Sequence, residues 1–155
     1  MVGIHNCGKM DSTNDIFWAK TTPDGRPGIS VKSHCLNVGC VAEAVIAALP
    51  HNVRALLPAG SATLAALHDV GKITIGFQAK CSSWMVSSTL PLCPPGEMTL
   101  SVTDHALVSQ YFLQELSDFS SARLWAVAVG SHHGRPKGKK IRAPLALMPF
   151  GNSSR

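Results

Sequence analysis

The alternation of apolar and polar positions along the chain predicts four helices and no convincing strand. The first helix is expected from Ser33, a suitable N-cap, to about Leu49, where Pro50 stops it. Its apolar residues recur at helical spacing and predict a buried stripe made of Val38, Val41, Ala42, Val45 and Leu49. His34 lies one turn before Val38 and is therefore expected to point inward.

The second and third helices also carry histidines at their ends. The second, about residues 61–69, ends in His68 and Asp69, and Gly71 is expected to follow it in the left-handed C′ conformation. The third begins at His105, after a cap by Thr103 or Asp104. Its inward face is expected to hold His105, Ser109, Phe112, Leu113 and Leu116.

The fourth helix, about residues 121–133, repeats the layout of the second. It is expected to bury Trp125, Ala128 and Val129 and to place His132 on the same stripe. The helix then ends in His133 and Gly134. Histidines therefore stand at the ends of all four predicted helices.

The remaining segments are rich in turn and loop residues. Residues 1–30 form an irregular lead-in with a dense turn signal at 22–28, residues 81–103 a long irregular loop, and residues 134–155 a basic tail. The 155 residues show no internal repeat and fit one domain, residues 1–155. The expected fold is all-α, a helical bundle.

Composition narrows the class of protein. Hydrophobic residues make up 45% of the chain and charged residues 15%, which excludes a disordered chain. No uncharged apolar run approaches the roughly 20 residues of a membrane span, and no signal-peptide core is apparent. The five cysteines are irregularly spaced and are expected to be reduced thiols. A cytoplasmic protein that does not contact a membrane is expected.

Five of the seven histidines stand at inward-facing helix ends, beside Asp69; they are His34, His68, His105, His132 and His133. A buried, hydrogen-bonded histidine is the ordinary alternative for each one taken alone, but five that converge with a carboxylate indicate a metal site. Imidazole and carboxylate ligands suit Fe, Mn, Ni, Co or Zn. One carboxylate can also bridge two ions, an arrangement suited to phosphoryl chemistry.

A basic run follows the last histidine and contributes to the net charge of +5. Its charged residues are Arg135, Lys137, Lys139, Lys140 and Arg142. This run can be interpreted either as a solvated face or as a nucleic-acid contact.

The order of these motifs resembles the HD nuclease domain of Cas3, the DNA-degrading effector of type I CRISPR systems. The resemblance covers about residues 16–137 and implies an HD-superfamily helical fold with metal-dependent cleavage of single-stranded DNA. The residues that carry it are, in order, Trp18-Ala19-Lys20, His34, His68-Asp69-Val70-Gly71-Lys72, Phe77-Gln78, His105 with Ser109, and His132-His133-Gly134.

The same resemblance assigns roles to residues. One or two divalent ions are implied, Mn, Ni, Co, Fe or Mg, together with single-stranded DNA, a separate helicase and a CRISPR effector complex as partners. Asp69 and Lys72 would be the catalytic residues, with Lys72 near the scissile phosphate. The first metal would be held by His34, His68 and Asp69, and the second by Asp69, His105, His132 and His133. DNA contacts are expected from Lys72, Arg135, Lys137, Lys139 and Lys140.

Two departures from the family pattern bear on activity. The chain has no Asp or Glu after Asp118, so the family's downstream aspartate, which completes the first metal site, is absent. The helicase that normally follows is missing as well, so a truncated relative with impaired activity is expected. The alternatives are a catalytically weak Cas3-like protein that acts by binding DNA or a CRISPR effector complex, and an HD phosphohydrolase that acts on nucleotides.

Overall fold

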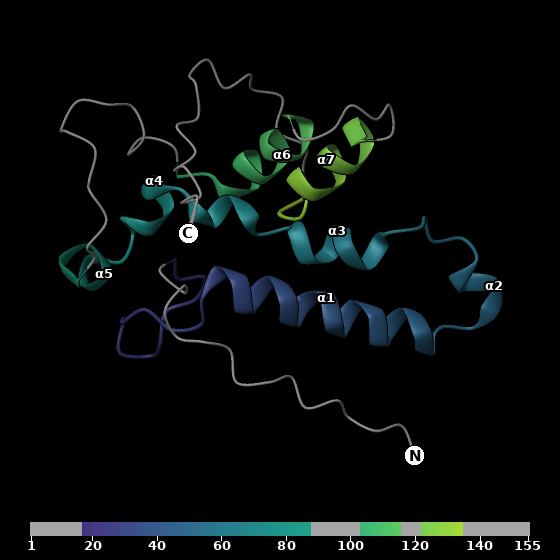
Figure 1. The fold of residues 1–155 in the computed structure, drawn as a ribbon, viewed down its shortest axis with the longest axis horizontal. Helices are drawn as coiled ribbons and strands as arrows, with labels where there is room; N and C mark the ends of the chain where they lie inside the picture. The colour runs from purple at the N-terminus through teal and green to yellow at the C-terminus, as the bar shows by residue number, and fades with distance from the viewer. Residues whose placement is uncertain (1–16, 88–102, 116–121, 135–155) are drawn as a thin grey trace, which may run out of the picture.

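The computed structural model of this chain describes residues 17–87, 103–115 and 122–134, and within them the secondary structure is helical (Figure 1). The elements are α1 (Val31–Ala48), α2 (His51–Arg54), α3 (Ser61–Leu67), the short 3-10 helix η1 (Val70–Ile73), α4 (Ile75–Gln78), α5 (Ser82–Ser87), α6 (His105–Glu115) and α7 (Ala122–Gly130). Figure 1 shows α3 between α1 on one side and the α6–α7 pair on the other. The all-α prediction is therefore confirmed for the described residues.

The described part of the lead-in, residues 17–30, folds back on itself before α1. Isolated antiparallel bridges pair Trp18 with Ser30 and Thr21 with Pro27. The predicted turn between them closes around Gly25, whose φ of +77° suits a residue without a side chain. This segment brings Trp18 back to the start of α1. Residues 1–16 lie outside the described part.

The start of α1 differs from the prediction because Ser30, and not Ser33, is its N-cap. The Ser30 hydroxyl accepts a hydrogen bond from the Ser33 N–H at 3.1 Å, which satisfies one of the free N–H groups of the first turn. The helix ends at Ala48, one residue before the predicted end, and Pro50 follows.

The predicted buried stripe of α1 is wrong, because none of its five members is buried: Val38, Ala42 and Leu49 are half-buried, and the other two are exposed. Val41 is 62% exposed and Val45 is 55% exposed. The helix instead approaches α3 at Gly39, where an added Cβ would lie 3.1 Å from the Ala66 Cβ. Because α1 is apolar on most sides, helical periodicity fits more than one face, and the sequence did not indicate which face α3 covers.

α1 meets a test of length and composition for a membrane span, although it contains Lys32 and Glu43 and is therefore not an uncharged apolar run. With 18 residues and a mean hydropathy of 1.2, α1 is long and apolar enough for a span by length and composition alone. A helix in a soluble bundle passes the same test, and α1 packs against α3. The finding is therefore weak evidence for a membrane.

The second predicted helix ends earlier than expected, and its glycine has a different role. α3 ends at Leu67, and Gly71 belongs to η1 instead of adopting the left-handed C′ conformation. Gly71 is needed for close packing, because an added Cβ would collide with the His105 carbonyl oxygen and lie 2.7 Å from the Ser109 nitrogen. The Gly71 N–H also donates to the Ser109 hydroxyl at 2.8 Å. These contacts hold α6 directly against η1.

The segment expected to be a loop from residue 81 begins with a helix. α5 covers Ser82–Ser87, and its Trp84 is buried. It joins a cluster formed with Trp18, Phe77 and Cys81, which lies beside η1 and α4. The prediction is therefore wrong for the first part of this segment, and residues 88–102 lie outside the described part.

The last two helices, α6 and α7, run in opposite directions in Figure 1 and pack against each other. The predicted cap of α6 is confirmed at Asp104, whose carboxylate accepts from the Leu107 N–H at 3.2 Å. The predicted stripe of α7 holds for Val129 and is wrong for Trp125, which is 37% exposed, and for Ala128, which is exposed. Ala126 takes the buried position instead.

Candidate metal centre

The structure brings all six expected metal ligands together from four separate helix ends. His34 lies in the first turn of α1, His68 and Asp69 follow α3, and His105 opens α6. His132 and His133 lie in the turn after α7, since that helix ends at Gly130 and not at His133.

Asp69 is the centre of this arrangement, and its two carboxylate oxygens serve different neighbours. Oδ2 lies 2.9 Å from His34 Nε2 and 3.2 Å from His68 Nε2. Oδ1 lies 3.2 Å from His105 Nε2 and 3.5 Å from His132 Nε2. The side chain is only 4% exposed, so these contacts occur away from bulk water.

Two of the histidines are oriented in the same way by their own helices. His68 Nδ1 lies 2.7 Å from the Ala65 carbonyl oxygen, and His132 Nδ1 lies 2.6 Å from the Val129 carbonyl oxygen. In both cases the acceptor is a carbonyl three residues back, at a helix C-terminal end where carbonyls lack helical partners. Nδ1 therefore carries a proton in both residues, so the neutral form of each imidazole has its lone pair on Nε2, the atom that faces the cluster and can bind a metal.

The donors divide into two groups in which the ligand atoms lie within 4.8 Å of one another. We call His34, His68 and Asp69 the first group, and His105, His132 and His133 the second group. Asp69 Oδ1 reaches the second group as well, so a single carboxylate joins the two.

The geometry of the second group suits a cation. His105 Nε2 lies 3.0 Å from His133 Nε2, 3.4 Å from His132 Nε2 and 3.2 Å from Asp69 Oδ1. One N–H on His105 can satisfy only one of these contacts, and the others would then set lone pairs against each other. A divalent ion bound between three imidazoles and a carboxylate would satisfy all of them, and this donor set suits Mn, Fe, Co, Ni or Zn.

The carboxyl of Asp69 is held in its charged form. Burial alone would raise its pKa, but hydrogen bonds from three neighbours outweigh burial and hold the pKa of Asp69 well below its usual value. These neighbours are His105, His68 and Lys72. An ionised carboxylate is the form that binds a metal.

The imidazoles differ in their preference for a proton. The hydrogen bond with Asp69 raises the pKa of His68 more than burial lowers it. Burial lowers the pKa of His34 and of His132, despite the opposing effect of Asp69 on both. The neutral form, which is the ligand form, is therefore favoured at His34 and His132.

Lys72 lies in a different place from the one expected. Its Nζ contacts Asp69 Oδ2 at 2.6 Å and the Ala19 carbonyl oxygen at 3.3 Å, and the residue is 5% exposed. A lysine at the rim, available to a DNA phosphate, was expected. The ammonium instead lies beneath Asp69 as its buried counter-charge. The other expected DNA contacts (Arg135, Lys137, Lys139 and Lys140) lie outside the described residues.

Two buried polar residues have roles at the centre that sequence reasoning did not assign. Ser109 is fully buried and holds Gly71, which fixes the distance between η1 and α6. Gln78 is fully buried and joins Lys72 to the lead-in through Trp18. Both residues are among those that carry the resemblance to the Cas3 HD domain, and that resemblance was the signal that could have identified them.

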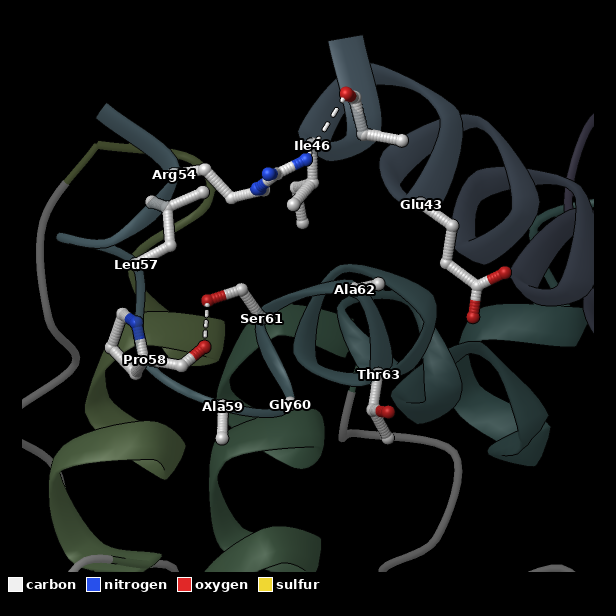
Figure 2. A pocket seen from close by; sticks show the side chains of 11 residues that line it. Glu43, Ile46, Arg54, Leu57, Pro58, Ala59, Gly60, Ser61, Ala62 and Thr63 are labelled. Atoms are coloured by element: carbon white, nitrogen blue, oxygen red, sulfur yellow. Dashed lines mark hydrogen bonds between the residues drawn. The ribbon is translucent and has the colours of Figure 1, made fainter. Parts of the chain in front are cut away.

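A separate pocket of about 550 Å³ lies between α1, α2 and α3, and no member of the metal centre lines it (Figure 2). Two of its polar side chains are engaged in hydrogen bonds with backbone carbonyls. Arg54 donates to the Ala47 carbonyl oxygen at 3.4 Å, near the end of α1, and the Ser61 hydroxyl donates to the Pro58 carbonyl oxygen at 2.7 Å. We therefore place the chemistry at the histidine cluster and not at this pocket.

Comparison with known proteins agrees with this geometry. Residues 18–150 match the family "Cas3, HD domain". The chain is also 33% identical, over 136 residues, to the CRISPR-associated endonuclease/helicase Cas3 of Thermus thermophilus; the match covers 77% of this chain and 14% of that relative. No solved structure matches. With its six clustered ligands inside the matched range, the chain belongs to the Cas3 HD-domain family.

Proposed function

We propose that this chain is a metal-dependent nuclease that cleaves single-stranded DNA in CRISPR interference, together with a helicase and a CRISPR effector complex. The observation that carries the proposal is the pair of ligand groups joined by Asp69. Two cations held by one bridging carboxylate are a recurrent arrangement in enzymes that hydrolyse phosphodiesters. Family membership supports the same class of reaction.

The residues of the chain have distinct tasks in this proposal. When bound, divalent ions would supply polarisation of a backbone phosphate and activation of water. Asp69 would present one oxygen to each group, and the Ala65 and Val129 carbonyls would hold His68 and His132 in the ligating tautomer. His133 is exposed, so the second group is open to solvent and accessible to a polymer.

The test is cleavage of a single-stranded oligonucleotide by protein loaded in turn with Mn, Co, Ni or Fe, with double-stranded DNA as the comparison. His68→Ala should abolish cleavage, and a chelator should do the same. The matched control is His51→Ala, because His51 lies exposed in α2 and belongs to neither ligand group. Cleavage that survives His68→Ala or the chelator would place the activity elsewhere or in a contaminant.

A second candidate function is binding without efficient cleavage, for example occupation of DNA or of an effector complex. One observation favours it: the Lys72 ammonium lies on the oxygen that Asp69 would offer to the first group. A wild-type protein that binds single-stranded DNA but does not cut at any metal concentration would support this candidate.

A further inference from the structure

Gln78 is a fully buried glutamine, and both the oxygen and the nitrogen of its side-chain amide form hydrogen bonds. Its Oε1 accepts from the Trp18 N–H at 3.0 Å, and its Nε2 donates to the Trp18 carbonyl at 2.9 Å and to the Lys72 carbonyl at 2.6 Å. The amide thus pairs with both backbone groups of Trp18, as a neighbouring strand would. Its Oε1 must face the N–H of Trp18, so this contact also fixes the orientation of the amide.

The contact with Trp18 continues to the metal centre. Once Trp18 is fixed, the next residue, Ala19, presents its carbonyl to the Lys72 ammonium at 3.3 Å. That ammonium lies 2.6 Å from Asp69 Oδ2. Gln78 therefore holds Lys72 at both ends, directly at its carbonyl and through Ala19 at its ammonium.

The backbone of α4 adds a further contact to the same segment. The Gln78 carbonyl accepts from the Trp18 indole N–H at 3.2 Å, and the indole packs on Phe77 with ring centroids 4.9 Å apart. Trp18 thus lies 60 residues away in sequence from Gln78 and is tied to α4 by three hydrogen bonds with Gln78 and one aromatic contact with Phe77.

We propose that Gln78 is a positioning residue for the metal centre: it locks residues 18–19 against α4 so that the Lys72 ammonium stays at one place on Asp69, which leaves Asp69 Oδ1 aimed at the second group. This inference rests on the proposed metal-binding function. A Lys72 that lost its anchor would still attract Asp69 but would no longer hold it in one orientation. Without any ammonium at this position, Asp69 keeps its contacts with His34, His68 and His105.

The experiment measures Co²⁺ affinity and the ligand-field absorption of bound Co²⁺ in the full chain. Gln78→Met removes the amide at similar length and should weaken Co²⁺ binding about tenfold or more, the range found for residues that orient metal ligands, with a change in the absorption band. Adding Lys72→Met should restore most of the lost affinity, because the unanchored ammonium is then gone. The lower melting temperature caused by Gln78→Met should persist in the double variant.

Cys81→Ala is the matched control, because Cys81 belongs to the same buried cluster of Trp18, Phe77 and Trp84 but has no contact with Lys72. It should lower the melting temperature and leave Co²⁺ affinity and absorption unchanged. Equal loss of Co²⁺ affinity in Cys81→Ala and Gln78→Met would overturn the proposal, and so would wild-type Co²⁺ binding by Gln78→Met. Undiminished loss in the double variant would overturn it too.

Hydrogen exchange of the wild-type protein gives a test that needs no variant, should Gln78→Met fail to fold. Co²⁺ should slow exchange of the Trp18 amide, whose partner is the Gln78 side chain, far more than exchange in the last turns of α1. Equal effects on both segments would overturn the proposal while the metal site stands. A wild-type protein that takes up no Co²⁺ would overturn the proposed function, and this inference with it.

Discussion

The Lys72 ammonium lies 2.6 Å from Asp69 Oδ2, and both residues are buried. The first ligand group therefore already contains a positive charge on the oxygen that it shares with His34 and His68. The second group receives the opposite oxygen, Oδ1, and has three imidazoles of its own. A cation entering the first group must displace or repel the ammonium, whereas among the described residues no lysine or arginine is paired with Asp69 Oδ1, the oxygen that the second group receives.

We therefore expect one tightly bound ion in the second group and weak binding in the first. Lys72→Met should raise the stoichiometry from one ion towards two, measured by metal analysis after dialysis and by calorimetry. The metal-free variant should lose about 1–3 kcal/mol of unfolding free energy. That is less than the roughly 3–5 kcal/mol typical of a broken buried ion pair, because three imidazoles still contact Asp69. An unchanged stoichiometry would show that Lys72 does not control the first group.

Asp69→Asn removes the charge that both groups share and keeps the shape of the side chain. Metal binding should fall by at least about 100-fold, more than for a residue that only orients ligands, because a first ligand is lost from each group. The matched control is Asp24→Asn, an exposed aspartate whose partners are Thr22 and Arg26, and it should bind metal normally. Stoichiometric metal retained by Asp69→Asn would refute the ligand assignment.

The helix ends that carry ligands were predictable, because a histidine at the edge of an apolar stripe can be recognised from local periodicity. His68, His105 and His132 were placed in this way, and Asp104 was recognised as a cap. The face of α1 that packs on α3 was not predictable, because the exposed Val41 and Val45 have the same helical spacing as the half-buried Val38 and Ala42.

The burial of Lys72 could not be predicted from the local sequence either. A lysine just after a helix usually reaches solvent, and what buries this one is the Ala19 carbonyl, 53 positions away in sequence. The 3-10 geometry after Leu67 depends in the same way on a tertiary contact, the approach of Ser109 to Gly71. Contacts between distant segments, and not local preference, decided both features.

Gly71→Ala tests whether close packing of η1 on α6 sets the distance between the two groups. The added Cβ would collide with the His105 carbonyl oxygen, which belongs to the backbone and cannot move alone. We expect a loss of about 2–4 kcal/mol in unfolding free energy together with loss of metal affinity, because α6 carries His105.

Gly39→Ala is the control for this substitution. Its Cβ would approach the Ala66 Cβ at 3.1 Å, a contact that a small shift between α1 and α3 can relieve, and alanine gains helix propensity. Its unfolding free energy should stay within about 1 kcal/mol of wild type, with metal bound normally. Normal metal affinity in Gly71→Ala would show that the position of His105 does not depend on this contact.

Acid should release metal from the two groups in sequence. Protons compete with metal for imidazole, so affinity falls as pH falls. The raised pKa of His68 means that the first group begins to lose affinity at a higher pH, whereas the lowered pKa of His132 keeps this ligand of the second group in its neutral form to a lower pH. A Co²⁺ titration followed by absorption from pH 8 downwards should show two steps in Lys72→Met, which binds both ions. A single step, or release of the second group first, would contradict this order.

The basic tail should contribute to DNA affinity through phosphate contacts. Each phosphate contact on single-stranded DNA contributes about 0.7 to the slope of log affinity against log salt. Replacing Arg135, Lys137, Lys139 and Lys140 by Gln should therefore lower that slope by up to about 2.8, with a larger loss of affinity at low salt than at high salt. Lys32→Gln, a single exposed charge at the start of α1, is the control and should change the slope by less than about 0.7. The measurement for this prediction is fluorescence anisotropy of a labelled oligonucleotide between low and physiological salt, with a chelator present to prevent cleavage. Because the chelator also removes metal from the centre, the slope then reports the tail and not the cations. An unchanged slope in the fourfold variant would show that these four residues form a solvated face and do not contact DNA.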